Sequence, residues 1–272
     1  MPILGFGVYQ IPPEKTKSAV LDAIDVGYRL IDTAQSYCNE TEVGKAIGEC
    51  GVSREELFIT TKVWIENYGY EKCRDSVLKF MERLGLDYID LVLLHQPFSD
   101  YYGAYRALED LYDEGLIKAI GVSNFYPDRL TDICLFERKV IPAINQVEVN
   151  PFNAQFLAQA NMEKNGVQME AWAPFAEGKN DIFNNDALVK IAEKNNKTSA
   201  QVILRWLVER SIVVLSKSTH KERMAENIDI FDFALDENDM IEIIKLDKSK
   251  SMFFNHDDPE VIECFDEIVD VK

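Results

Sequence analysis

Residues 57–95 read LFITTKVWIENYGYEKCRDSVLKFMERLGLDYIDLVLLH, and this stretch shows the repeating unit of the fold. It begins with an apolar run at 57–63 and ends with another at 88–94, each of the length of a buried strand. The segment between the two runs has apolar residues at the spacing of an amphipathic helix: Val77, Phe80, Met81 and Leu84. A strand, a helix and a second strand in this order predict two parallel strands joined by a crossover helix.

The same unit recurs along the chain. Helical spacing appears again at Ala200, Ile203, Leu204 and Leu207. Eight apolar runs are candidate strands, at 3–9, 28–32, 57–63, 88–94, 119–122, 143–149, 168–172 and 212–215. Eight alternating units are the number that closes a barrel, so we predict an α/β fold, a single-domain (β/α)8 TIM barrel over residues 1–248. An open doubly wound sheet is the alternative, and residues 249–272 are expected to form a C-terminal tail that packs near the substrate rim.

The composition argues against several classes of partner. The 272 residues are 47% hydrophobic, which is enough for one sizeable core. The 29 Lys and Arg stand against 47 Asp and Glu, and the net charge of −18 repels nucleic acid and anionic membranes. We therefore expect neither of these partners, and an isolated basic cluster would be informative.

The cysteines and the start of the chain bear on the compartment. The five cysteines form no CxxC pair, so we expect no metal site and a reducing, cytoplasmic setting. The start lacks a basic segment followed by a long apolar stretch, and no window approaches ~18 consecutive apolar residues. No coiled-coil pattern is present, so we expect a monomer.

Polar residues end several of the predicted strands, and in a barrel such residues gather at the carboxy-terminal rim. Asp32 ends the second run, Lys62 lies near the end of the third, and His95 follows the fourth. Tyr37 is close enough to Asp32 in sequence for its loop to fold over the same rim. Read singly, each has an ordinary role, as a helix cap, surface lysine, core histidine or loop aromatic. Together they favour catalysis.

These four residue types suit acid catalysis on a carbonyl. A free phenol has a pKa of roughly 10, and an ammonium nearby favours the phenolate, so Lys62 is expected to lower the pKa of Tyr37. Asp32 would keep Lys62 charged and in place. His95 would orient the substrate oxygen, on which hydride attack builds negative charge.

A basic cluster follows the eighth run, where barrels commonly bind phosphate; it consists of Lys217, Lys221 and Arg223. Thr219 and Glu222 have the spacing of a capping box and predict a helix N-terminus, which attracts anions. Read alone, the segment is an ordinary solvated helix start. A guanidinium and an ammonium at one phosphate suit NADPH, whose 2′-phosphate NADH lacks. No GxGxxG of a Rossmann site follows a strand.

Six strings of sequence occur in a characteristic order: Asp32-Thr-Ala-Gln-Ser-Tyr37, Thr60-Thr-Lys62-Val-Trp64, Leu94-His95-Gln-Pro97, Gly121-Val-Ser-Asn-Phe125, Asn145-Gln-Val-Glu148 and Ser216-Lys-Ser-Thr219 with Arg223, Glu226 and Asn227. In this order they resemble the signatures of the aldo-keto reductase family, its 2,5-diketo-gluconate reductase-like and aldose reductase-like members included. The resemblance covers roughly residues 2–259. It implies that Tyr37 is the proton donor, Lys62 and Asp32 its tuning pair, and His95 the group that orients the substrate.

The resemblance also implies a complete NADPH site. Lys217, Ser218 and Arg223 would hold the 2′-phosphate, and Glu226 and Asn227 would face the adenine. The nicotinamide would contact residues at the ends of the fifth, sixth and seventh runs, with the ring stacked on the last of them: Ser123, Asn124, Gln146 and Trp172. Outside this pattern, a Ser-Asn pair is more often a turn and a tryptophan more often part of the core.

Three aromatic residues follow strand ends and are expected to wall the substrate pocket: Tyr9, Trp64 and Phe98. Packing at the barrel rim is the alternative. Cys38 is either a redox-sensitive thiol or, as we favour, a small buried filler.

The chain departs from the family pattern at three places. Gln96 stands where many members have an aromatic residue after the histidine, which predicts a more polar pocket. Trp172 and Ala173 stand where Tyr and Ser are frequent, so stacking is kept while one cofactor hydrogen bond is in doubt. The chain opens at Met1-Pro-Ile-Leu-Gly, where members usually have a β-hairpin that closes the barrel bottom; we expect the hairpin to be absent and stability, rather than chemistry, to be affected.

The leading hypothesis is an enzyme that reduces aldehydes, ketones or keto-sugars with NADPH, using Tyr37 as the proton donor. A nucleotide-binding regulatory subunit without turnover is the first alternative, although all four catalytic positions are filled. A Schiff-base aldolase with Lys62 as nucleophile is the second, and it would leave Tyr37 and Arg223 unexplained.

Overall fold

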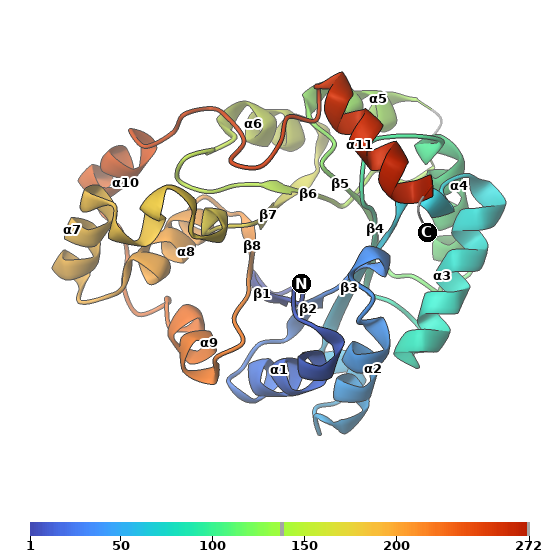
Figure 1. Cartoon of the computed structure of the whole chain (residues 1–272), viewed down its shortest axis with the longest axis horizontal. Helices are drawn as coiled ribbons and strands as arrows, with labels where there is room; N and C mark the ends of the chain where they lie inside the picture. Colours follow the sequence, from blue (N-terminus) through green and yellow to red (C-terminus); the bar gives the residue numbers. More distant parts are fainter. Residues whose placement is uncertain (137–138, 271–272) are drawn as a thin grey trace.

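The computed structural model describes residues 1–136 and 139–270, the last three of these by backbone only. Eight parallel strands form a closed barrel, in which each strand pairs with its sequence neighbours and β1 also pairs with β8 (Figure 1). The strands are β1 Leu4–Gly7, β2 Leu30–Asp32, β3 Phe58–Val63, β4 Leu91–Leu94, β5 Ile120–Ser123, β6 Ile144–Glu148, β7 Gln168–Trp172 and β8 Val213–Ser216. The predicted barrel is confirmed, and the open sheet is wrong.

Helices surround the barrel on its outside, and the last of them lies over its rim, as Figure 1 shows. They are α1 Pro13–Asp25, α2 Glu40–Glu49, α3 Tyr70–Leu84, α4 Tyr101–Asp113, α5 Pro127–Leu135, α6 Phe156–Asn165, α7 Asp186–Asn195, α8 Ser199–Glu209, α9 Lys221–Ile228, α10 Glu237–Ile244 and α11 Pro259–Asp270. The two helices predicted from apolar spacing are α3 and α8, and each buries its apolar stripe against the strands. In the described chain, no helix combines the length and the apolar character needed to cross a bilayer.

Apolar side chains fill the part of the barrel that lies toward the amino-terminal ends of the strands. Two small apolar clusters lie apart from the main core. One consists of Leu30, Val213 and Leu215, and the other of Leu91, Leu93 and Ile144. Phe58 packs against both clusters. We call these six residues the apolar floor. Gly5 on β1 makes room for it, because a Cβ at this position would lie 2.6 Å from Leu30.

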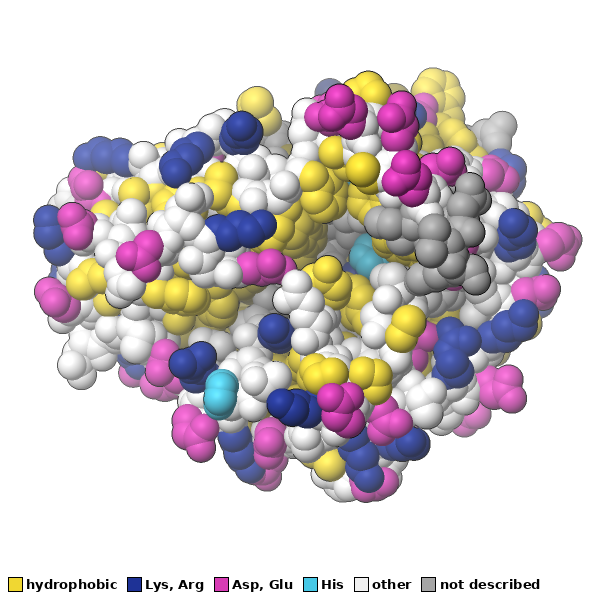
Figure 2. Space-filling model, in the orientation of Figure 1, with side chains coloured by type: hydrophobic (Ala, Val, Ile, Leu, Met, Phe, Trp, Pro, Cys, Tyr) yellow, Lys and Arg dark blue, Asp and Glu magenta, His cyan; other side chains and the backbone are white. Residues whose placement is uncertain are grey.

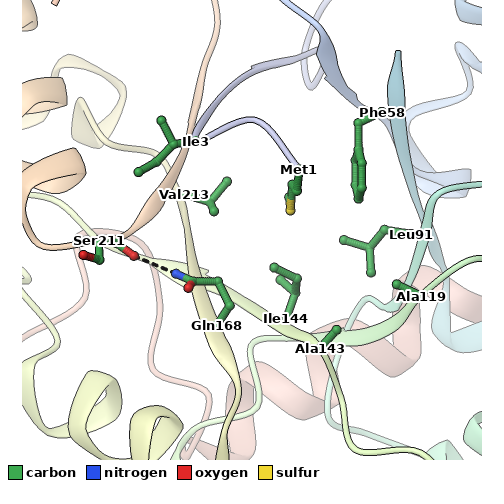
Figure 3. A pocket seen from close by; sticks show the side chains of 10 residues that line it. All are labelled: Met1, Ile3, Phe58, Leu91, Ala119, Ala143, Ile144, Gln168, Ser211 and Val213. Carbon is green, nitrogen blue, oxygen red and sulfur yellow. Dashed lines mark hydrogen bonds between the residues drawn. The ribbon is translucent and has the colours of Figure 1, made fainter. Parts of the chain in front are cut away.

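A cavity of about 490 Å³ opens beneath the apolar floor, at the amino-terminal ends of the strands. Met1 and Ile3, which precede β1, line it together with Phe58, and Figure 3 shows these side chains around a common space. The predicted catalytic residues lie at the opposite end of the strands, so this cavity is no part of their site.

The chain after α10 returns across the carboxy-terminal rim and ends in α11, as the red segment of Figure 1 shows. Glu148, at the end of β6, anchors it: its carboxylate accepts hydrogen bonds from Ser251 Oγ at 2.5 Å and from the Met252 amide at 2.9 Å. Farther along, the Phe265 ring lies 5.9 Å from the ring of Trp64, which follows β3.

Candidate active site

Three of the four predicted catalytic residues form a hydrogen-bonded group at the ends of β2 and β3. Lys62 is fully buried, and its ammonium donates to Asp32 Oδ1 at 2.5 Å, to the Thr33 carbonyl at 3.1 Å and to Tyr37 Oη at 3.3 Å. All three ammonium protons are therefore used. Because an ammonium can only donate, Tyr37 Oη accepts in this contact, and its own hydrogen stays available to another acceptor.

The pKa of Tyr37 differs from the expectation. Burial raises it to about 12, and this effect is larger than the lowering by the Lys62 ammonium. Lys62 thus lowers the pKa of Tyr37 as expected, but the net shift is upward, since the sequence reveals the neighbouring charge but not the loss of water around the phenol. Burial also opposes the charge on Lys62, but Asp32 and Tyr37 outweigh it and raise the pKa of the ammonium. Lys62 is therefore charged and Tyr37 protonated at neutral pH.

His95 lies beside this group, directly after β4. Its ring makes edge contacts with Tyr37, at 5.8 Å between centroids, and with Trp64, at 5.1 Å. Burial, and then the charge of Lys62, hold the pKa of His95 well below its usual range. The imidazole is therefore neutral and can orient an oxygen without being an acid.

Gln146 reaches the same group from β6, although its predicted place was at the nicotinamide. Its side-chain nitrogen donates to Asp32 Oδ2 at 3.1 Å and to Glu170 Oε2 at 2.9 Å, which uses both amide protons on carboxyl groups. Glu170 lies on β7 and is fully buried. Sequence reasoning missed this residue, and the available signal was an acidic residue in the middle of the run at 168–172.

Three of the predicted cofactor residues fasten strand ends to one another: Ser123, Asn124 and Trp172. The Ser123 hydroxyl donates to the Gln146 carbonyl at 2.9 Å. Asn124 donates to the His95 carbonyl at 3.1 Å and accepts from the indole nitrogen of Trp172 at 2.9 Å. The Trp172 ring also packs against Phe253 of the tail, at 5.1 Å.

Among the described residues, one cation of the basic cluster forms ion pairs with carboxylates and the other two do not. Lys221 pairs with Asp25 of α1 at 2.5 Å, while Lys217 and Arg223 are exposed and make no ion pair within the described ranges. Figure 2 shows Lys and Arg side chains in dark blue over the region of α9. A chain of net charge −18 thus keeps two cations available at one place.

The predicted capping box at Thr219 is wrong. The N-cap of α9 is His220, and no side chain in the described chain caps it. Ser218 Oγ instead accepts from the His220 amide at 3.0 Å, so the helix starts one residue later than the pattern indicates. The uncapped N–H groups beside Lys217 and Arg223 fit an anionic group.

The two residues expected at the adenine have different surroundings. Glu226 is half-buried, and its carboxylate accepts from Thr198 Oγ1 at 2.8 Å. Asn227 lies on the buried face of α9.

The predicted pocket residues contact either the catalytic group or the tail, and Trp64, which packs on both His95 and Phe265, contacts both. Tyr9 packs on Tyr37 at 4.9 Å, and Phe98 packs on Phe265 at 5.5 Å. Figure 2 shows this face hollowed at its centre, with hydrophobic side chains around a histidine. Three tail residues that sequence reasoning missed complete the wall: Phe254, His256 and Phe265.

Gln96 and Cys38 directly follow two of the predicted catalytic residues, His95 and Tyr37. Gln96 is buried, and its Oε1 lies 3.0 Å from His256 Nε2, so its amide joins the tail to the loop after β4. Cys38 is exposed and has a left-handed backbone with φ 57°, so the expectation of a buried filler is wrong.

The fold and this site define a barrel built around a buried lysine, aspartate and tyrosine with a neutral histidine beside them. Residues 4–248 match the Aldo/keto reductase family, and the chain belongs to this family of oxidoreductases. It is 46% identical to a glyoxal reductase of Bacillus subtilis (strain 168) over 95% of this chain and 93% of that one. It is 42% identical to the methylglyoxal reductase DkgA of Escherichia coli (strain K12), over 93% and 92% of the two chains.

Solved structures agree with this assignment. An aldo-keto reductase from a Medee basin deep-sea metagenome library superposes with a TM-score of 0.92 at 42% identity, over 95% of this chain and 96% of that one. A Bombyx mori aldo-keto reductase in complex with NADP superposes with a TM-score of 0.89 at 33% identity, over 94% and 92%.

Proposed function

We propose that this protein reduces aldehydes, ketones or keto-sugars to alcohols with NADPH, and that Tyr37 donates the proton. One observation carries the proposal: the Lys62 ammonium donates to Tyr37 Oη at 3.3 Å, which leaves the phenol hydrogen for a substrate oxygen. The pKa of about 12 keeps that hydrogen in place until negative charge develops on the substrate.

The residues present fit NADPH as the cofactor. The Bombyx mori relative is in complex with NADP, and a second similar structure, at 34% identity, is in complex with NADPH. Lys217 and Arg223 stand unpaired, within the described part of the chain, beside the uncapped start of α9, as a phosphate requires. When bound, NADPH supplies the hydride.

The protein side chains divide the remaining work. Lys62 stabilises the tyrosinate that remains after proton donation, and Asp32 holds Lys62 at 2.5 Å. His95 is neutral, so it orients the substrate oxygen and does not compete with Tyr37 as an acid. Ser123 and Asn124 fix the strand ends on which these residues lie.

The pocket wall favours small substrates. Tyr9, Trp64 and Phe98 line the site with rigid aromatic faces, and Phe265 of the tail packs on the last two of them. Two relatives are named as glyoxal and methylglyoxal reductases, so small 2-oxo aldehydes are the first substrates to test.

The test is Tyr37→Phe, which keeps the ring and removes the proton. We expect turnover of methylglyoxal to fall by at least roughly 100-fold, the usual contribution of a positioned acid. NADPH binding, followed by nucleotide fluorescence, should persist. Tyr112→Phe, an exposed tyrosine on α4, is the matched control and should keep wild-type turnover. Unchanged turnover in Tyr37→Phe would contradict the role.

The two alternatives lead to different measurements. A regulatory subunit would bind NADPH tightly and turn over no member of a broad carbonyl panel. A Schiff-base aldolase needs an unprotonated lysine, whereas Lys62 is charged and donates all three of its protons. Borohydride should therefore trap no adduct at Lys62.

We further propose a monomer in a reducing compartment such as the cytoplasm. Cys38, Cys50, Cys73 and Cys264 carry free thiols, which persist where disulfides do not form. Light scattering coupled to size-exclusion chromatography tests the first statement, and localisation of a tagged chain tests the second.

A further inference from the structure

Glu170 is a buried carboxyl group that the proposed mechanism does not use. It lies in the middle of β7, where its strand neighbours are Gln146 on β6 and Val213 on β8. Oε2 accepts the single bond from Gln146, and Oε1 has no hydrogen-bond partner among the described residues. A buried carboxylate with one hydrogen bond is costly, so this position favours the neutral acid.

The surroundings of Glu170 explain why it stays neutral. Val213 belongs to the apolar floor, and β8 carries no ionisable side chain between Val213 and Ser216. The charged groups that act on Glu170 are Asp32 from β2 and Lys62 from β3. Burial, followed by repulsion from Asp32, raises the pKa of Glu170 to about 8.

A chain of hydrogen bonds connects this carboxyl group to the proton donor. Gln146 bridges Glu170 and Asp32, Asp32 binds Lys62, and Lys62 binds Tyr37. An amide does not pass a proton along such a chain, so Glu170 cannot act as a proton relay. It acts through the position of Gln146 and through its own charge.

We propose that protonated Glu170 is a positioning residue for carbonyl reduction: it holds Gln146 against Asp32, and its ionisation slows proton donation by Tyr37. This inference rests on the proposed function. With Glu170 neutral, Asp32 and Lys62 balance each other. When Glu170 is ionised, its carboxylate adds a second negative charge near Asp32 and Lys62. This charge raises the pKa of Tyr37 and makes the phenol a weaker acid. Glu170 does not touch Tyr37, so this effect passes through the field at Asp32 and Lys62, and we expect it to reach at most about one pKa unit, or tenfold in acidity.

The test compares kcat for methylglyoxal reduction from about two pH units below to about two above the pKa of Glu170, which is about 8. The wild type should lose roughly three- to tenfold in kcat across this range through ionisation of Glu170, because the rate of proton donation follows the acidity of Tyr37 only in part. Glu170→Gln is uncharged throughout and keeps an acceptor for Gln146, so its kcat should change by less than about twofold. Glu170→Leu is also uncharged but cannot hold Gln146, so its kcat should be low at every pH. Glu242→Gln, on the surface of α10, is the control and should follow the wild-type profile.

A second readout does not depend on turnover. Infrared difference spectra between the two ends of the pH range should show the carbonyl band of a protonated carboxylic acid in the wild type, and Glu170→Gln should lack it. A wild-type profile retained in Glu170→Gln, or an unchanged infrared band, would overturn the inference. Failure of the proposed function gives a different result, namely no turnover by the wild type at any pH.

Discussion

Trp172 and Asn124 are joined by a hydrogen bond of 2.9 Å from the indole nitrogen to the side-chain carbonyl, and Asn124 donates in turn to the His95 backbone. Trp172 ends β7, and the other two residues follow β5 and β4. Asn124 has φ 63°, a left-handed conformation that asparagine tolerates better than most residues. Non-neighbouring strand ends are therefore locked together at the candidate site.

Trp172→Phe removes the indole donor and keeps an aromatic face. We expect kcat/KM for methylglyoxal to fall roughly 3- to 10-fold, since a lost hydrogen bond of about 1 kcal/mol loosens Asn124 and with it His95. Steady-state kinetics measure the effect. Asn124→Ala should be worse, because it loses both bonds and strains the backbone. Equal kcat/KM in Trp172→Phe and the wild type would show that the bond does not position the site.

Arg223→Ala should raise the KM for NADPH at least roughly tenfold and leave the KM for NADH nearly unchanged, because only NADPH offers a 2′-phosphate to the guanidinium. Lys221→Ala is the matched control, since Lys221 is already paired with Asp25. It should change both constants by less than about twofold. Equal increases for the two nucleotides in Arg223→Ala would exclude the phosphate contact.

Asp32→Ala should destabilise the fold as well as impair catalysis. It leaves the fully buried Lys62 without its carboxylate, which costs roughly 3–5 kcal/mol in the free energy of unfolding. The double variant Asp32→Leu with Lys62→Met removes both charges and should be more stable than Asp32→Ala. Urea unfolding measures both, and Lys17→Ala, which breaks an exposed pair with Glu49, should cost at most about 1 kcal/mol. A double variant less stable than Asp32→Ala would contradict the expectation.

Acid should weaken the attachment of the tail through His256. Burial lowers the pKa of His256 to about 4, below the value of about 6.5 in the unfolded chain, so the unfolded state binds the proton more readily. The stability that neutral His256 contributes is present above about pH 6.5 and is lost as the pH falls toward 4, by up to about 3 kcal/mol.

His256→Gln should remove this part of the acid sensitivity and keep a polar partner for Gln96. Thermal unfolding between the two pH limits measures the difference from the wild type. His220→Gln, at an exposed histidine, is the control and should behave as the wild type. Parallel stability curves for His256→Gln and the wild type would be the contrary result.

The local features of the fold were predictable from the sequence. Apolar runs and the spacing of Val77, Phe80 and Met81 depend on neighbours along the chain, so all eight strands and α3 were found. The convergence of Asp32 and Lys62 followed from the barrel, since it places neighbouring strand ends together.

The features that depend on distant segments were not predictable. Glu170 meets Asp32 through Gln146 across the barrel, and His256 meets Gln96 only because the tail folds back. The net pKa of Tyr37 depends on how far water is excluded, which no residue pattern states. The start of α9 was missed because the Ser218 hydroxyl takes the amide of His220.

Because the tail is anchored at Glu148, the catalytic group and the entrance to the site are built from different parts of the chain. The residues that we propose to move the proton belong to strands of the barrel and the loops that follow them, whereas Phe254, His256 and Phe265 belong to a segment fastened to the barrel through Ser251 and Met252. Substitutions or exchange of that segment can reshape the entrance without disturbing the barrel. Selection, natural or in the laboratory, can therefore change the choice of carbonyl while the chemistry is inherited intact.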